Sequence, residues 1–488
     1  MEQEKNQKQN KKILQYIMMA IAIILVIGLT IFFIRLGINK HNERKYRYFD
    51  YELDNTVAVI NRYSGSEEDV IIPEYITING EDYLVTTIKM GAFSNHESVK
   101  NVNLPNSITT IEPYSFDSCK SLEKVQMGDN VIFLGAYAFY DCENLISINL
   151  SSNLEEIGAG CFSKCTSLED IVLPSSLKKI NNETFMKCKK LKNISLPNDV
   201  SSIGEATFYG CENLEHIEIN DKLDSIGEKA FMECKALKEF TFNEKIEEIK
   251  DYSFAYCSSL DEIEIPNNIK TIGKYAFNGC SNVKSLKLSD VLEVIDEGCF
   301  AGCASLTNLK LTSNITRIER AAFANCKDIN SIEFNDKLSF IGYDAFDNLE
   351  NLKKLVIPDC IKHIELGAFS GCISLEELKI PFIGDGTNDI NYLGHIFGAF
   401  SHNVNSAYIP MSLKTVRLSK ACKSIKYQAF TGCMYIEKLI IPDSVIEIDA
   451  LAIPNFNITI YCEENEMPNT WNQNWNYYNK TVVWGYKE

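Results

Sequence analysis

The sequence predicts a solenoid of stacked coils, preceded by one transmembrane helix. Phe recurs every 23 residues from Phe93 to Phe369 without exception, and two further copies follow at Phe400 and Phe430. Residues 13–34 contain no charged side chain. A supersecondary unit repeated about fifteen times indicates a solenoid, because each unit buries its apolar face only against its neighbours.

The N-terminal part divides into a basic tail at 1–12 and an apolar helix at 13–34. Twenty-two residues at 1.5 Å rise give roughly 33 Å of helix, enough to cross the hydrocarbon core. A cleaved signal peptide is the competing interpretation, but the run exceeds the usual apolar length and "FFIRLGINK" offers no small-x-small cleavage site. We therefore expect an uncleaved anchor. The flanking Lys and Arg residues are nearly balanced, so the external position of the C-terminal body is a preference.

The remaining segments follow in order. Residues 35–47 form a charged linker, and residues 48–92 form an N-terminal cap. In this cap "YELDNTVAVINRYSG" alternates like a strand, and Asn79-Gly80 predicts a hairpin turn. The repeats extend over 93–449, with an insertion near 380–412. An aromatic C-terminal cap covers 450–488.

One coil, "LEDIVLPSSLKKINNETFMKC" from Leu168 to Cys188, shows the expected elements. Leu168, Ile171 and Leu173 point inward, around a short strand that Pro174 ends. A second inward pair, Leu and Ile, follows. Several copies then carry Gly, where we expect a tight bend. The "AF" or "TF" step opens one short helical turn, on which Phe and the residue three positions later share a face. These glycines are Gly204, Gly227, Gly273 and Gly342.

Phe and Cys therefore occupy fixed interior slots, one of each per coil. Three copies carry His96, Leu349 or Asn403 in the Cys slot, which leaves neighbouring thiols without obligate partners. The odd total of 17 Cys and the absence of a C-x-x-C pair favour buried free thiols over a disulfide framework or a zinc cluster. The slot cysteines are Cys119, Cys142, Cys165, Cys188, Cys211, Cys234, Cys257, Cys280, Cys303, Cys326, Cys372 and Cys433.

The pattern L-x-x-I-x-[IL]-P-x-x-[ILV]-x-x-I-G-x-x-A-F-x-x-C resembles the BspA-type leucine-rich repeat family, and "LDEIEIPNNIKTIGKYAFNGC" from Leu260 to Cys280 matches it closely. The segments "YLGHIFGAF", "SLKTVRLS" and "VVWGY" also look like modules of bacterial members. The resemblance covers roughly residues 50–488. It implies a curved leucine-rich repeat solenoid, with short parallel β-strands on the concave side and turns and short helical segments elsewhere. It further implies display on a cell surface for attachment or recognition, and it carries over no catalytic residues.

The charge balance excludes one class of partner. With 48 Lys+Arg against 66 Asp+Glu, the net charge is −18, and the body after residue 48 carries −24. Phosphate backbones repel such a body, so we expect no nucleic-acid partner.

If the strands line the concave face, their outward positions are candidate ligand contacts. The face changes along the repeats from acidic to basic, which suits a charged partner or a cation. The competing interpretation is an ordinary solvated face. The candidates are Asp170, His216, Glu218, Glu239, Glu262, Glu264, Lys287 and Lys310.

The insertion and the tail each allow two interpretations. Asp385, Asn388 and Asp389 offer oxygen ligands for calcium, but their spacing fits no complete calcium loop, and a plain turn is the alternative. The tail holds Trp471, Trp475 and Trp484 among tyrosines and asparagines. These aromatics suit either a sugar-stacking platform or a plug over the open end of the solenoid.

No sequence motif indicates catalysis, since the chain lacks H-E-x-x-H, G-x-S-x-G and a phosphate-binding glycine loop. We expect neither a cofactor nor a metal. The leading hypothesis is a single-pass protein of the cell membrane whose external solenoid recognises a protein or glycan without catalysis. The alternative is a passive scaffold or spacer of the cell envelope.

Overall fold

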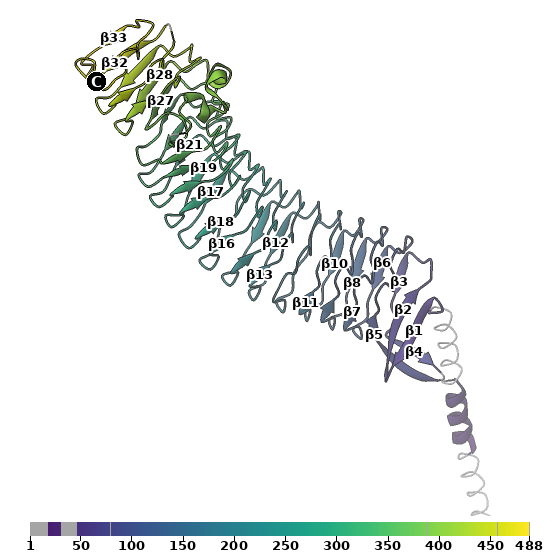
Figure 1. Cartoon of the computed structure of the whole chain (residues 1–488). Coiled ribbons are helices and arrows are strands. Elements are labelled where there is room, and N and C mark those ends of the chain that lie inside the picture. Colours follow the sequence, from purple (N-terminus) through teal and green to yellow (C-terminus); the bar gives the residue numbers. More distant parts are fainter. Residues whose placement is uncertain (1–17, 31–45, 79, 388, 456, 488) are drawn as a thin grey trace, which may run out of the picture.

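The computed structural model describes residues 18–30, 46–78, 80–387, 389–455 and 457–487. The body is an elongated, bent solenoid whose N-terminal cap and C-terminal end lie at opposite extremes (Figure 1). Residues 18–30 are helical. Every helix in these ranges falls short of the length and apolarity that crossing a membrane requires. Residues 13–17 and 31–34 of the predicted transmembrane segment lie outside the described residues, as do the 1–12 tail and most of the linker.

The N-terminal cap is built from two hairpins. The segment predicted as one strand forms β1 and β2, which pair antiparallel, because Asn55 adopts a left-handed conformation with φ of 55° and turns the chain. β4 and β5 form the hairpin predicted around Gly80, and Asn79 itself is outside the described residues. The strands are β1 (Phe49–Asp54), β2 (Val57–Tyr63), β3 (Asp69–Ile71), β4 (Tyr75–Ile78) and β5 (Glu81–Ile88).

The first ladder of the solenoid consists of the strands that the Leu-x-x-Ile pattern predicts. They pair in parallel, one per coil, and β3 of the cap pairs with β6 to start the ladder. The members are β6 (Asn101–Asn103), β8 (Lys124–Gln126), β10 (Ser147–Asn149), β12 (Asn193–Ser195), β14 (His216–Glu218), β17 (Glu262–Glu264), β19 (Ser285–Lys287), β21 (Asn308–Lys310), β23 (Ser331–Glu333), β25 (Lys354–Val356), β27 (Glu377–Ile380), β28 (Thr415–Leu418), β30 (Lys438–Ile441), β32 (Thr459–Cys462) and β33 (Val482–Val483).

A second ladder of two-residue strands follows the second inward position of each coil. It starts where β5 pairs with β7. The members are β7 (Thr110–Ile111), β9 (Phe133–Leu134), β11 (Glu156–Ile157), β13 (Ser202–Ile203), β15 (Ser225–Ile226), β16 (Glu248–Ile249), β18 (Thr271–Ile272), β20 (Val294–Ile295), β22 (Arg317–Ile318), β24 (Phe340–Ile341), β26 (His363–Ile364), β29 (Ser424–Ile425) and β31 (Glu447–Ile448).

The Phe segment of each coil is a series of tight turns and not the predicted helical turn. In one coil, Tyr140 N donates to Tyr137 O and Cys142 N to Phe139 O, each three residues back. Tyr137 and Asp141 are left-handed, with φ of 57° and 59°, which prevents a continuous helix. Phe139 N instead donates to Cys161 O of the next coil at 2.9 Å, so this side of the solenoid also forms a ladder.

The glycines before this segment have a role different from the expected one. Gly204, Gly227, Gly273 and Gly342 do not appear among the left-handed residues. They allow close approach of the preceding coil, because a Cβ added at Gly227 would lie 2.5 Å from Glu205 N. Left-handed glycines lie on both sides of Phe instead, as Gly298 with φ of 59° does before Phe300 and Gly302 with φ of 74° does after it.

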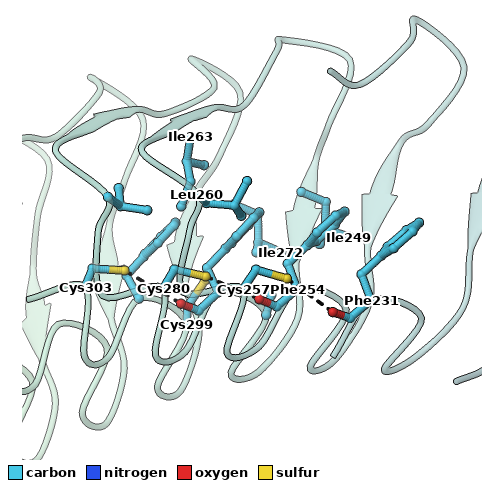
Figure 2. Packing of buried hydrophobic residues seen from close by; sticks show 14 of the residues in the cluster. Phe231, Ile249, Phe254, Cys257, Leu260, Ile263, Ile272, Cys280, Cys299 and Cys303 are labelled. Carbon is cyan, nitrogen blue, oxygen red and sulfur yellow. Dashed lines mark hydrogen bonds between the residues drawn. The ribbon is translucent and has the colours of Figure 1, made fainter. Parts of the chain in front are cut away.

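Phe and Cys form the interior ladders that the repeat predicts. The rings from Phe93 to Phe369 stack at centroid distances of 4.7 to 5.7 Å. The twelve slot cysteines are buried and free, as predicted. In eleven of them the thiol donates to the Phe carbonyl of the preceding coil at 2.9 to 3.6 Å. Figure 2 shows this contact between Cys257 and Phe231.

The insertion changes which Phe follows Phe369 in the buried ladder, where Phe400 was predicted. Phe369 N donates to Ile396 O, which puts Phe397 in the position of the next buried Phe. Phe397 is 1% exposed, whereas Phe400 is 68% exposed. Phe400 is therefore not a member of the ladder, and Asn403 is an exposed residue that does not fill the Cys slot. The prediction at Phe400 was wrong because the inserted residues precede the Phe segment and change which Phe is buried.

Candidate functional site

The exposed side of the first ladder forms a long, largely polar surface, which we call the strand face. It consists of the first and third residues of each strand, and of the equivalent residues in coils that form no strand, while the middle residue points into the core. In β17, for example, Glu262 and Glu264 are exposed and Ile263 is buried. All eight predicted candidates, Asp170, His216, Glu218, Glu239, Glu262, Glu264, Lys287 and Lys310, are exposed residues of this face. Its position on the concave side of the bend stays a prediction.

Ion pairs between neighbouring coils neutralise the predicted change from acidic to basic charge. Lys287 pairs with Glu264, which lies opposite it in the parallel register, and this hydrogen bond raises the pKa of Lys287. Lys310 pairs with Glu333 at 3.1 Å. The two basic candidates therefore each have an acidic partner.

The acidic candidates further toward the N-terminus have weaker partners. Glu218 accepts a hydrogen bond of 2.8 Å from Ser195 Oγ. His216 Nδ1 lies 3.9 Å from Glu239, whose side chain is 79% exposed. This part of the strand face keeps more of its negative charge than the part around Lys287.

Four hollows lie along the strand face. The amide hollow, of about 330 Å³, is lined by Asn101, Asn103, Gln126 and Asn149 with their neighbours. The valine hollow, of about 450 Å³, surrounds Asp170 and Val172. The phenylalanine hollow, of about 390 Å³, is lined by Glu218, Asp221, Glu239, Phe240 and Phe242, with Ile217 and Ile219. The ion-pair hollow, of about 810 Å³, contains Glu264, Lys287 and Lys310.

Three of these hollows coincide with interruptions of the first ladder. Around Asp170 only one bridge, to Ser147, remains. Residues 239–241 form no strand, so β14 and β17 lie on either side of an unpaired coil. β19 and β21 are likewise unpaired at the ion-pair hollow. Six of the eight candidates therefore line a hollow, while His216 and Glu262 line none of the four.

The phenylalanine hollow contains two residues that were not among the predicted candidates. Phe240 and Phe242 occupy the inward positions that hold Ile263 and Ile265 in the next coil. The segment "LKEFTF" is the signal that identifies them, because it alone has two Phe at these positions. The sequence alone does not show that these two residues are accessible, because it does not show that their coil forms no strand.

The insertion replaces one coil of the second ladder and leaves the first ladder intact. β27 pairs directly with β28, whereas β26 and β29 belong to separate sheets. Ile364 N donates to Asp385 O instead of to a strand partner. The insertion contains the short helices η1 (Leu393–Phe397), η2 (His402–Val404) and α2 (Asn405–Tyr408). The strand face therefore continues past it.

Buried polar side chains hold the insertion in place. Asn405 Oδ1 accepts from Gly394 N at 3.1 Å, and its Nδ2 donates to Thr431 O at 2.9 Å. His395 Nε2 lies 3.2 Å from Ile364 O, and burial lowers the pKa of His395. These contacts favour a structural role for both residues.

The calcium hypothesis for the insertion gains no support from its geometry. The Asp385 carboxylate accepts from Thr387 N and Oγ1, each at 2.8 Å, in a local turn. Asn388 lies outside the described residues. Throughout the ranges that the structure describes, there is no cluster of three His, Cys, Asp or Glu residues that would hold a metal ion.

The tryptophans of the tail fill the end of the core. Trp471 and Trp475 are buried, and their ring centroids are 5.1 Å apart. Trp471 Nε1 donates to Val445 O at 3.0 Å, and Trp484 packs against the same rings. This packing favours the plug over the open end of the solenoid, because the two buried rings offer no face for stacking a sugar.

Comparison with known proteins identifies the repeat. A family model described as "BspA type Leucine rich repeat region (6 copies)" matches residues 86–215, 178–306, 293–395 and 399–479. No curated protein matches the sequence.

Solved structures of bacterial leucine-rich repeat proteins resemble this chain. A leucine-rich repeat protein from Bacteroides ovatus has 22% identity and a TM-score of 0.56, over 81% of this chain and 94% of its own. A leucine rich cell surface protein from Faecalibacterium prausnitzii has 24% identity and a TM-score of 0.41, over 67% and 92%. The leucine-rich repeat protein of T. pallidum has 32% identity and a TM-score of 0.38, over 40% and 89%. The similarity to the Bacteroides ovatus protein shows that this chain has the leucine-rich repeat fold.

Proposed function

Because the chain belongs to the BspA-type leucine-rich repeat family, whose members generally have binding or scaffold roles, we propose that it is a membrane-anchored cell-surface protein. Its strand face recognises an external protein or glycan, and it acts without catalysis. The observation that carries this proposal is the long exposed face of the first ladder, which continues past the insertion through direct pairing of β27 with β28.

Three features support recognition by the strand face. Its side chains are polar and exposed, its backbone is held by the core beneath, and hollows open along it. Rigid, preorganised surfaces lose little conformational entropy on binding. The anchor rests on the uncharged run of residues 13–34 in the sequence.

The experiment compares two quadruple variants of the full chain expressed on cells. One reverses Glu218, Glu239, Glu262 and Glu264 to Lys on the strand face. The matched control reverses the exposed residues Glu155, Glu156, Glu248 and Glu293 to Lys beside the second ladder, with the same change in charge. Binding of the cells to arrayed matrix proteins and glycans is measured.

We expect the strand-face variant to lose at least tenfold in binding and the control to remain within twofold of the parent. Equal binding by all three chains would indicate a passive spacer instead. Protease added outside intact cells tests the orientation, because an external body is cleaved and an internal one is protected.

A further inference from the structure

Two half-buried rings form the floor of the phenylalanine hollow. Phe240 and Phe242 take inward positions beside the Phe ladder, where Phe240 lies 5.4 Å from Phe231 and 4.8 Å from Phe254 between ring centroids. Both rings stay partly exposed, and their coil forms no strand. The rings meet edge to face at 4.9 Å.

The rim of this hollow is acidic. Glu218, Asp221 and Glu239 line it, and its described lining includes no lysine or arginine. The ion-pair hollow differs, since its Glu264 is matched by Lys287. An aromatic floor under carboxylates that have no lysine or arginine in the lining is complementary to a cation with an apolar stem.

We propose that the phenylalanine hollow binds an arginine or lysine side chain of a partner polypeptide. The cation lies over the Phe240 and Phe242 rings and forms charge-assisted hydrogen bonds with Glu218 and Glu239. The acidic rim repels phosphate and sulfate groups. A neutral sugar has no charge that the carboxylates of the rim could attract. This inference rests on the proposed function, because it takes the strand face as the contact surface and specifies what the partner presents there.

The test uses the full chain with ¹³C-labelled isoleucine δ1 methyl groups, observed by NMR. Ile217 and Ile219 line the hollow and report its occupancy. The probes are tri-arginine amide and its neutral isostere, tri-citrulline amide. We expect saturable shifts of the two methyl signals with tri-arginine and at least tenfold weaker binding of tri-citrulline.

Three variants separate the contributions. Glu218→Gln with Glu239→Gln is expected to weaken tri-arginine binding about tenfold, whereas the control Glu155→Gln with Glu156→Gln, away from the strand face, changes it less than twofold. Phe242→Leu keeps an apolar side chain of the kind that Leu288 and Leu311 provide in later coils. It is expected to weaken binding about threefold, through loss of a ring face.

Several results would overturn the inference: equal shifts by tri-arginine and tri-citrulline, an equal loss in the control variant, or shifts by a neutral oligosaccharide with none by tri-arginine. The outcome is independent of the cell-binding test. If strand-face variants abolish cell binding while tri-arginine leaves Ile217 and Ile219 unshifted, the inference fails and the proposed function stands.

Discussion

The buried thiol ladder makes the stability of the solenoid sensitive to alkaline pH. Burial raises the pKa of Cys119, Cys280 and Cys372 to about 12, from an ordinary value of 9.0. In the unfolded chain these thiols ionise near their ordinary value, so above it the unfolded state binds fewer protons than the native state. The free energy of unfolding therefore falls as the pH rises from 9 toward 12.

The size of the effect follows from the two pKa values. Between pH 8 and pH 10, each of these three thiols costs about 1.3 kcal/mol of unfolding free energy, or about 4 kcal/mol together. Burial also raises the pKa of Cys142 and Cys211, which adds in the same direction. A loss of this size is a large part of the usual stability of about 5–15 kcal/mol.

The assay is urea unfolding of the full chain at pH 8 and pH 10, followed by far-UV circular dichroism and thiolate absorbance near 240 nm. We expect the midpoint to fall sharply at pH 10 and the thiolate signal to appear together with unfolding. Cys280→Ala should reduce the pH-dependent loss by about 1.3 kcal/mol. The control Leu306→Ala, also buried in the core, should lower stability at both pH values without changing that loss.

Two results would refute this reasoning. The first is thiolate formation in the folded protein near pH 9, because it would mean that the ladder is open to water. The second is a Cys280→Ala variant with the same pH-dependent loss as the parent.

Three further predictions concern particular residues. Phe397→Ala should cost about 3–5 kcal/mol in urea unfolding, and Phe400→Ala less than about 0.5 kcal/mol, because only Phe397 is buried; the reverse order would place Phe400 in the ladder instead. Asn405→Ala should cost about 3 kcal/mol and speed hydrogen exchange of residues 393–405, because Gly394 N and Thr431 O lose their partner; unchanged exchange would contradict the anchoring role. Of the 17 cysteines, all in the described ranges, only Cys360 is not buried, so a bulky thiol reagent should label about one thiol per native chain quickly; rapid labelling of several would contradict the packing.

The repeat period predicted the stacking and the interior Phe and Cys slots, and the family resemblance implied the parallel strands. These features depend on one side chain per coil meeting its equivalent in the next coil, which a sequence period expresses directly. The thiol contact with the Phe carbonyl was not predictable from the period, because it depends on the path of the backbone between coils.

The predictions from the sequence were wrong where the conformation of the backbone, and not the type of side chain, determines the local structure. The left-handed residues before and after Phe include Tyr137, Lys187 and Lys229, residue types that carry no turn signal. Phe400 fitted the predicted pattern, yet the insertion displaced it. The candidate site was predicted as a row of charges, but neither the pairing of Lys287 with Glu264 nor the opening at Phe240 follows from residue types alone.

Direct pairing of β27 with β28 has an evolutionary consequence. The segment between these two strands can become longer, shorter or different in sequence on the flank of the molecule, while the first ladder stays paired on both sides of it. Descendants can therefore acquire new flanking modules while the strand face keeps its structure, and selection can act on the two regions separately.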